Sequence, residues 1–436
     1  MDARVLRAST LLALVVLAIS SDPNYDHQTS TYQAKYKGTY CRLLCTATPF
    51  FSPDLSIQTY VSLIQSAETS IDIFAPGFSS WSKCTPFTGC QGCSVADQKN
   101  EKFPVFPALL NAVHQRNITV RILTNSYDQS TCEGKITPLD WLFLNGIEIR
   151  IYTSTTFMHA KYMMIDKGKR TSVSSVNFSY TSFMLNREAG IVMEGTCNGA
   201  ITFYQKVFEG DWAKAASFKP TNSYSNGDMN IITDTSPYPV NIPTPRSVPG
   251  AYVTNFLPVE GITVKKVFAS PDYAREELES DTLSKVTKMF YLTVYQITDS
   301  DLCNKIQKLF ESGKEVKVMV SPRIVSYSDY KAAQACYQQL YTAGMKGYLR
   351  YAPHYYQYSH QKFWIVDNTT VHLSTGNWSP SDFPAGNSFP PYGHTGWHSV
   401  NRNFLVVLQS PLIVDDFYAV FTEDWQRGTD WAPRNH

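Results

Sequence analysis

The chain has 436 residues, 43% of them hydrophobic, and a formal net charge of +1. This length exceeds that of one ordinary domain and fits two lobes of about 170 residues each. The net charge falls to roughly zero without residues 1–20, which argues against a strongly basic protein that binds nucleic acid through its overall charge. Outside Lys167, Lys169 and Arg170, where we expect a solvated turn, no basic stripe follows the chain.

Residues 1–20 predict a signal peptide. Arg4 and Arg7 precede an apolar run over 11–19, and Ala18-Ile19-Ser20 is similar to a small-residue cleavage site. The apolar run is too short to span a bilayer, which argues against a membrane anchor. Because no other stretch is apolar enough to cross a membrane, we expect a soluble mature protein that is secreted or stays in the lumen of the secretory or lysosomal pathway.

The cysteines agree with an oxidising compartment. They are Cys41, Cys45, Cys84, Cys90, Cys93, Cys132, Cys197, Cys303 and Cys336. Disulfides are favoured over zinc at Cys90-x-x-Cys93, because no second pair follows at a matching spacing, and no metal site is predicted. Cys303 and Cys336 are the only two in the second half, so we expect them to pair. The odd total leaves one thiol free or shared between chains.

Lobe 1 is predicted over residues 50–215 and carries the first copy of a chemical pattern. This copy consists of His159, Lys161 and Asp166 in the spacing His-x-Lys-x4-Asp, followed by Ser175 and Asn177. The apolar stretch after the lysine predicts a buried strand. Because residues two apart on a strand share a face, the imidazole and the ammonium are expected to point into one space.

A linker is predicted over 216–260, where Pro, Ser, Thr and Asn are dense and apolar periodicity is weak. Lobe 2 is predicted over 261–428 and repeats the pattern. The second copy consists of His360, Lys362 and Asp367, followed by Ser374, Thr375 and Asn377. One copy would arise by chance in only a few hundredths of chains of this length, so two copies indicate an internal duplication.

The surroundings of the two copies are repeated as well. The strand-like segment 118–123 parallels 315–320, Asn186-Arg187-Glu188 parallels Asn401-Arg402-Asn403, and Phe208-x-x-Asp211-Trp212 parallels Phe421-x-x-Asp424-Trp425. The duplication therefore predicts two similar α/β lobes that face each other, each contributing half of one site. Two imidazoles and two ammonium groups suit a phosphodiester. One histidine would attack phosphorus, the other would protonate the leaving oxygen and then activate water, and the lysines would stabilise the charge without a metal or another cofactor.

At these residues the chain resembles the phospholipase D superfamily, whose active site is built from two such motifs, each usually followed by a Gly/Ser-Ser/Thr-x-Asn step. Here the steps are Ser174-Ser175-Val176-Asn177 and Ser374-Thr375-Gly376-Asn377. The resemblance covers most of the chain. It implies two α/β lobes packed face to face, each with a mixed central sheet flanked by helices, with His159 as nucleophile and His360 as general acid.

The resemblance also implies roles for the other motif residues. Asn177, Asn377, Ser175 and Thr375 would contact the substrate. Asp166 and Asp367 complete the catalytic motifs, although an Asp that closes a strand commonly forms a turn and the family's carboxylate mostly braces the fold. Glu188 and Asn403 would orient the histidines of the opposite lobes, so that one histidine has a carboxylate partner and the other an amide.

The substrate is less constrained by the sequence. Aromatic residues are dense near the second motif: Tyr351, Tyr355, Tyr356, Tyr358, Trp364, Trp378 and Trp397. They would seat a phospholipid at a bilayer surface, with choline held by cation–π contact, or they would stack nucleobases. We therefore favour a secreted phospholipase D that cleaves phosphatidylcholine-like lipids, with peripheral membrane contact. The alternative is a luminal or extracellular 5′ exonuclease on single-stranded nucleic acid. A binding protein with a relic site is disfavoured because all four His and Lys residues remain, and no obligate protein partner is predicted.

Overall fold

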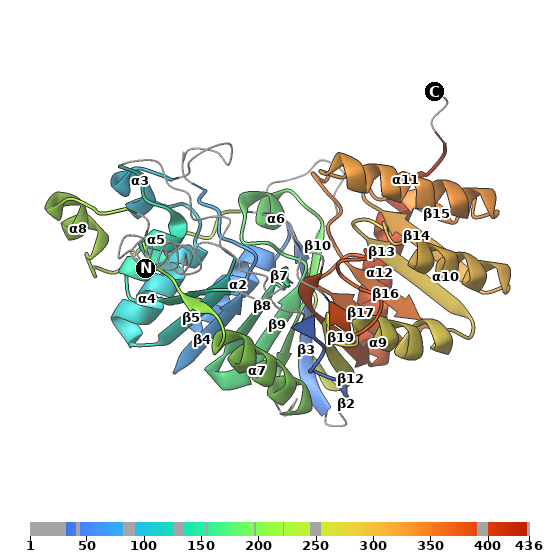
Figure 1. Ribbon diagram of the computed structural model, residues 1–436, viewed down its shortest axis with the longest axis horizontal. Coiled ribbons are helices and arrows are strands. Elements are labelled where there is room, and N and C mark those ends of the chain that lie inside the picture. The colour runs from blue at the N-terminus through green and yellow to red at the C-terminus, as the bar shows by residue number, and fades with distance from the viewer. Residues whose placement is uncertain are drawn as a thin grey trace, which may run out of the picture.

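The structure is a computed structural model that describes residues 32–40, 44–81, 92–125, 134–152, 156–195, 198–220, 222–244, 254–389 and 400–433. It has the predicted α/β fold with two lobes. Figure 1 shows lobe 1, coloured blue to green, at the left and lobe 2, coloured yellow to red, at the right. The predicted signal peptide lies outside the described residues.

The sheet of lobe 1 is mixed. Its strands lie in the order β11 (Ala216–Ser217), β6 (Glu148–Ile151), β5 (Thr119–Thr124), β4 (Ser70–Phe74), β8 (Tyr162–Ile165), β9 (Arg170–Ser174) and β10 (Glu188–Glu194). Strands β4, β5 and β6 are parallel, whereas β8, β9 and β10 run antiparallel to their neighbours. Ile71, Ile73, Ile122 and Met163 are fully buried, as expected for central strands covered on both faces.

Lobe 2 repeats this arrangement. Its strands lie in the order β19 (Asn401–Gln409), β17 (Thr370–Ser374), β16 (Phe363–Val366), β13 (Met289–Val294), β14 (Glu315–Val320), β15 (Leu349–Tyr351) and β20 (Thr429–Asp430). The parallel strands β13, β14 and β15 correspond to β4, β5 and β6 of lobe 1. The strand that directly follows each His-x-Lys motif, β8 or β16, therefore lies beside the parallel part of its own sheet.

The two sheets are continuous. Strand β3 (Leu44–Ser52) pairs with β10 on one side and with β12 (Val259–Ser270) on the other, and β12 pairs with β19. Shorter strands add to this joint: β2 (Thr39–Tyr40) pairs with β12, β7 (Phe157–Met158) pairs with β19 of the opposite lobe, and β1 (Tyr32–Gln33) pairs with β18 (Ser388–Phe389). The lobes are thus joined by backbone hydrogen bonds as well as by side-chain packing.

Helices cover both faces of the sheet. In lobe 1 they are α2 (Ser56–Gln65), α3 (Val95–Lys99), α4 (Val105–Arg116), α5 (Pro138–Leu144), α6 (Tyr180–Met184) and α7 (Asn198–Trp212). In lobe 2 they are α9 (Ala274–Asp281), α10 (Ser300–Glu311), α11 (Tyr327–Thr342) and α12 (Pro411–Arg427). Apolar residues of α7 and α12, among them Phe208 and Phe417, pack in one core that both lobes share, whereas α2 with α4 and α10 with α11 enclose a separate core in each lobe.

The predicted linker contains ordered structure. Helix α8 (Asn226–Ile232) begins after Ser225, whose side chain accepts a hydrogen bond from the backbone N–H of Asp228. Ile232 and Tyr238 are buried against the core of lobe 1. This segment therefore packs on lobe 1 before the chain crosses to lobe 2, although its composition predicted only a connection.

The predicted disulfide between Cys303 and Cys336 is confirmed. It joins α10 to α11, with 5.8 Å between the two Cα atoms. Cys45 and Cys93 are disulfide-bonded as well.

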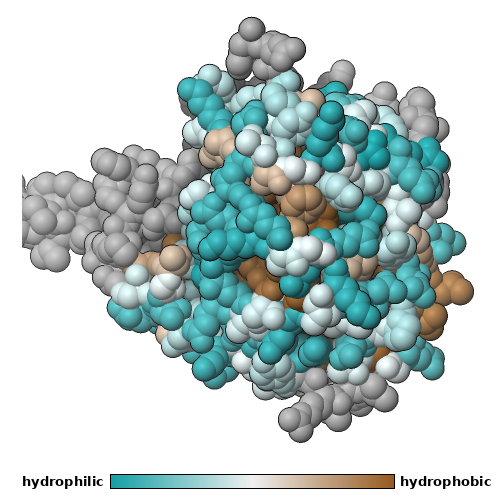
Figure 2. Space-filling view, turned by 90° about the vertical axis from the view of Figure 1, so that its right-hand side faces the viewer, coloured by the Kyte–Doolittle hydropathy of each residue, from teal (hydrophilic) through white to brown (hydrophobic). Residues whose placement is uncertain are grey.

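The outer end of lobe 2 is mostly hydrophilic. Figure 2 views this end, and hydrophobic side chains show only in small areas between polar ones. Helix α10 illustrates the pattern, because Leu302 and Ile306 are buried while Asn304 and Lys308 are exposed. None of the helices in the described part of the chain is long and apolar enough to cross a membrane.

Candidate active site

The two His-x-Lys pairs occupy equivalent places, directly before β8 and β16. Both lysines are fully buried, whereas the histidine side chains keep 19% exposure for His159 and 12% for His360. Each lysine folds back on its own motif: Lys161 Nζ donates to the carbonyl of His159 and Lys362 Nζ to the carbonyl of His360, both at 2.6 Å. Each lobe therefore presents the edge of an imidazole above a buried ammonium group.

The four groups influence one another across the two lobes. Burial is the largest cause of the lowered pKa of Lys161, and the charge of Lys362 lowers it further. Burial lowers the pKa of Lys362 to about 7 and that of His360 to about 4, even though the charge of Glu188 raises both. The pKa of His159 is lowered by burial and then by Lys161. These charge effects agree with one site shared by both pairs, and a bound phosphoryl anion would supply negative charge beside these groups.

A buried arginine of lobe 1 fixes the backbone of His360. The N–H of His360 donates to the carbonyl of Arg187 at 2.7 Å. The Arg187 guanidinium is fully buried and forms ion pairs at 3.1 Å with Asp54 of its own lobe and at 3.1 Å with Asp424 of lobe 2. Because both carboxylates are buried, this cluster clamps the two lobes directly behind the histidine.

A buried arginine of lobe 2 holds the backbone of His159 in the same way. The N–H of His159 donates to the carbonyl of Arg402 at 3.1 Å. Arg402 is fully buried and pairs with Asp211 of lobe 1 at 2.8 Å and with Asp272 of its own lobe. The repeats Asn-Arg-Glu/Asn and Phe-x-x-Asp-Trp were signals for these clamps, but the sequence alone did not connect each arginine with the aspartate of the other lobe.

The side chain of His360 has a carboxylate partner, as predicted. Its Nδ1 lies 2.8 Å and 3.1 Å from the two carboxylate oxygens of Glu188. Ser175 and Asn186 donate to the same carboxylate at 2.6 Å and 3.0 Å. Burial alone would raise the pKa of Glu188, but the charge of His360 and these hydrogen bonds keep it below its usual value. The ionised carboxylate holds the proton on Nδ1 and leaves Nε2 of His360 for the substrate.

The side chain of His159 has one more partner than the predicted amide of Asn403. Its Nδ1 lies 3.0 Å from Asn403 Oδ1, as expected, but also 3.2 Å from a carboxylate oxygen of Asp382. Asn403 Nδ2 donates to that same oxygen at 2.8 Å. His159 therefore has an amide and a carboxylate as partners rather than an amide alone. The sequence did not indicate Asp382, because it lies in a turn at the start of the insertion that separates Asn377 from Asn403.

Ser175 and Thr375, predicted to contact the substrate, have hydrogen-bond partners within the protein. The Ser175 hydroxyl donates to Glu188, and the Thr375 hydroxyl donates to Asn403 Oδ1 at 2.9 Å. Both residues are fully buried. They support the side chains that hold the histidines, and their contact with a substrate stays a prediction.

Asn177 and Asn377 follow β9 and β17 at equivalent positions. Asn377 Oδ1 is buried and has no hydrogen-bond partner among the described residues. Its backbone N–H is held by Asp382 at 2.9 Å. A buried, unsatisfied amide is costly unless a ligand or water completes it, which agrees with the predicted contact to a phosphoryl group.

Asp166 and Asp367 lie at the other end of their strands, away from the imidazoles. The Asp166 carboxylate accepts hydrogen bonds from the backbone N–H groups of residues 68–70, and Asp367 accepts from those of residues 287–289. Both residues adopt the left-handed conformation, with φ of 51° and 52°. This geometry favours the bracing role over direct chemistry.

Half of the described members of the aromatic group predicted near the second motif belong to the core, and Tyr351, Tyr355 and Tyr358 are half-buried. Tyr356, Trp364 and Trp378 are fully buried, and Trp397 lies outside the described residues. Tyr358 contacts the ring of Tyr295, and Tyr295 lies edge-on to His360 with 5.1 Å between the ring centroids. Tyr295, which the sequence did not single out, therefore borders His360, and Phe157 borders His159 with 6.4 Å between the ring centroids.

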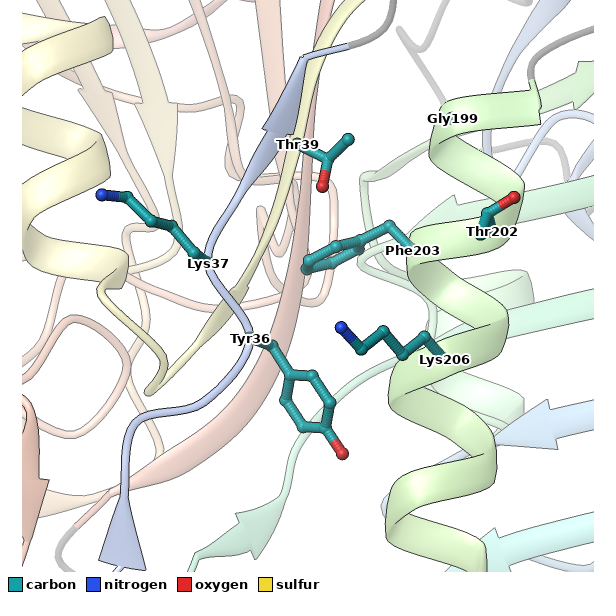
Figure 3. A pocket seen from close by; sticks show the side chains of 7 residues that line it. All are labelled: Tyr36, Lys37, Thr39, Gly199, Thr202, Phe203 and Lys206. Atoms are coloured by element: carbon teal, nitrogen blue, oxygen red, sulfur yellow. The ribbon is translucent and has the colours of Figure 1, made fainter.

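A separate pocket of about 470 Å³ lies between the N-terminal segment and α7. Figure 3 shows Tyr36, Lys37 and Thr39 on one wall and Gly199, Thr202, Phe203 and Lys206 on the other. It contains none of the predicted site residues. Within the described ranges, no group of three or more His, Cys, Asp or Glu side chains is arranged to hold a metal ion.

Comparison with known proteins agrees with this geometry. The family model described as cardiolipin synthase, PLD-like domain matches residues 60–212 and 280–425, one match in each lobe and together more than half of the chain. The curated mitochondrial cardiolipin hydrolase of Xenopus laevis is 28% identical over 109 residues, which are 25% of this chain and 49% of that protein. The chain thus spans about half the length of this relative.

One solved structure with a TM-score above 0.5 has a similar fold. The phosphatidylserine synthase of Haemophilus influenzae Rd KW20 matches with a TM-score of 0.57 and 12% identity over 89% of each chain. The phospholipase D family member Nuc of Salmonella typhimurium matches 40% of this chain and 99% of its own, with a TM-score of 0.32 and 19% identity.

Proposed function

Because this chain belongs to the PLD-like domain family, we propose that it is a phosphodiesterase that hydrolyses phospholipids such as phosphatidylcholine through a phosphohistidine intermediate. The observation that carries the proposal is the pairing of two buried His-x-Lys motifs, in which Nδ1 of each histidine is engaged by a side chain of the opposite lobe. This arrangement leaves both Nε2 atoms for the substrate. One is free to act as nucleophile while the other transfers a proton.

The reaction would proceed in two steps. In the first, Nε2 of His159 attacks phosphorus and forms a P–N bond, while the P–O bond to the head group breaks and the leaving oxygen takes a proton from Nε2 of His360. In the second, His360 removes a proton from water, and the resulting hydroxide displaces His159 to release phosphatidic acid. Lys161 and Lys362 stabilise the charge on the non-bridging oxygens in both steps.

The first step needs a protonated His360, and this form is favoured only when the substrate is bound. Burial holds its pKa at about 4 in the empty site, so the imidazole is neutral near pH 7. The negative charge of a phosphodiester beside it raises that pKa and favours the protonated form that the first step needs. An acidic compartment, such as the lumen in which the predicted signal peptide would place the protein, favours the same form.

A phospholipid substrate is supported by what the printed names of two relatives say: one is a cardiolipin hydrolase and the other a phosphatidylserine synthase. The low net charge of the chain also gives little attraction to a polynucleotide. Single-stranded nucleic acid remains the competing substrate, because the same two-histidine chemistry cleaves any accessible phosphodiester.

The test is to incubate the purified secreted protein with phosphatidylcholine vesicles and, separately, with single-stranded DNA, at about pH 5 and about pH 7. We expect free choline and phosphatidic acid, with more turnover at the lower pH. Activity should survive EDTA because the lysines supply the positive charge. Shortened oligonucleotides without choline release would assign the nuclease function, and loss in EDTA with recovery in zinc or magnesium would contradict the site.

A further inference from the structure

Two positions near the site carry exchanged residue types in the two lobes. The first is the fifth residue after the Asn of each motif, which is Ser182 in lobe 1 and Asp382 in lobe 2. The second is the start of the strand that follows, which is Glu188 in lobe 1 and Asn403 in lobe 2. Each lobe therefore has one carboxylate and one neutral side chain at these positions, but in opposite places.

The hydrogen bonds show that the two positions belong to one unit in each lobe. In lobe 1, Asn186 bridges them, donating to Glu188 at 3.0 Å and to Ser182 at 3.4 Å. In lobe 2 the equivalent Asn401 donates to Asp382 at 2.7 Å. Glu188 and Asp382 are both buried, and each reaches Nδ1 of the histidine that the opposite lobe contributes.

Asp382 is held in place by four further donors. Its Oδ1 accepts from Asn403 and Asn401, and its Oδ2 accepts from the backbone N–H of Asn377 at 2.9 Å and from the Ser379 hydroxyl at 2.7 Å. A carboxylate with this many donors stays ionised although it is buried. It is thus a fixed negative charge beside His159, whose other charged neighbours, Lys161 and Lys362, are positive.

We propose that Asp382 is a positioning residue for His159, and that in lobe 2 the orienting carboxylate has moved from the strand position, now Asn403, to this turn position. The proposal rests on the phosphodiesterase function. When Nε2 of His159 attacks phosphorus, Nδ1 keeps its proton and the ring becomes cationic. An amide fixes the tautomer, but only a carboxylate also stabilises that cation.

A charge exchange between neighbouring side chains tests the proposal. Asp382→Asn removes the charge and nearly preserves the shape, and the double variant Asp382→Asn with Asn403→Asp returns a carboxylate to the position 3.0 Å from His159 Nδ1. The primary measurement is the pKa of His159 from ¹⁵N-histidine NMR titration, assigned with His159→Gln. This measurement needs no substrate, so it remains informative even if the proposed reaction is wrong.

The expected result has three parts. In Asp382→Asn the pKa of His159 falls by at least about one pH unit, because the remaining charged neighbours are cations, and kcat falls at least about tenfold. The double variant restores both. Ser379→Ala, which removes one hydrogen bond to Asp382 but keeps its charge, leaves the pKa of His159 unchanged. An unchanged pKa in folded Asp382→Asn would overturn the proposal. If that variant does not fold, a folded double variant with the pKa and kcat of the native protein supports it, and one with a lowered pKa and low kcat overturns it.

Discussion

The two lobes agree in how they hold the backbone of each histidine and differ in how they hold its side chain. Arg187 and Arg402 are equivalent. The carbonyl of each arginine accepts the N–H of a histidine, and each guanidinium pairs with two aspartates, one from each lobe. The side-chain partners are Glu188 in one lobe and Asn403 with Asp382 in the other. The two lobes thus hold the histidine backbone in the same way, whereas the orienting carboxylate comes from a different position in each lobe.

The largest effect is expected from replacing either histidine. His159→Asn and His360→Asn should each lower turnover by at least about a thousandfold, because each removes one end of a two-part relay. A substrate whose leaving group needs no protonation distinguishes the two histidine variants. With that substrate, His360→Asn should accumulate a phosphoramidate on His159, detected by mass spectrometry of peptides kept at alkaline pH.

The same experiment decides the roles of the two histidines. An adduct on His360 in the His159→Asn variant would reverse our assignment while leaving the two-step reaction intact. The absence of an adduct in both variants would favour direct attack by water.

Replacing Arg187 or Arg402 should have the next largest effect. Arg187→Met and Arg402→Met should each lower the free energy of unfolding by about 3–5 kcal/mol, because two buried aspartates lose their counter-charge. Chemical denaturation measures this, and Arg187→Met combined with Asp424→Asn is the matched control that should recover part of the loss. Clearly unequal costs for the two arginines would contradict their equivalence.

Replacing a buried lysine should raise the free energy of unfolding, whereas replacing Arg187 or Arg402 lowers it. Lys362→Met should raise the free energy of unfolding by on the order of 2 kcal/mol at pH 7 while lowering turnover roughly a hundredfold. The pKa of Lys362 is about 7 in the folded protein and 10.5 ordinarily, so between these values the unfolded state binds more protons. Native stability therefore rises with pH across this window, and the advantage of the methionine variant should shrink there. The measurement is thermal unfolding from pH 7 to pH 10.5 without phosphate, with Lys161→Met for comparison.

The smallest effects should come from Asp166→Asn and Asp367→Asn. Each should lower the free energy of unfolding by about 1–2 kcal/mol through weakened hydrogen bonds to the backbone, and turnover should fall by less than about tenfold. Both carboxylates have pKa values below the usual 3.8, so their contribution is present above that pH and is lost as the pH falls further. If turnover fell nearly as far as in the histidine variants, Asp166 and Asp367 would have a direct catalytic role.

Sequence reasoning predicted the parts of the site that depend on short spacing. His159 and Lys161 are two residues apart on an extended segment, so their shared direction follows from strand geometry alone. The duplication then predicted a second, equivalent pair. The α/β fold and the disulfide between Cys303 and Cys336 were also predictable, because both depend on patterns within one lobe.

Contacts between distant segments could not be predicted in the same way. Arg187 meets Asp424 only because β3 and β12 join the two sheets, and nothing in the sequence near either residue encodes that joint. Asp382 contacts His159 because a turn folds back on β19, while the insertion after it hides the internal alignment. The hydrogen bonds of Ser175 to Glu188 and of Thr375 to Asn403 could not be predicted either, because each joins residues that are far apart in the sequence.

The continuous sheet limits how the site can move. Enzymes with two lobes often exclude water by closing one lobe over the substrate, and that motion needs a hinge. Here β10, β3, β12 and β19 pair in succession across the boundary, with bulges in β12, and hinge bending would break backbone hydrogen bonds between these strands. The strand pairing therefore favours a candidate site that is preorganised rather than closed by a hinge motion of the lobes. In the proposed reaction, the substrate itself would displace solvent from the site, and the water for the second step would enter after the head group leaves.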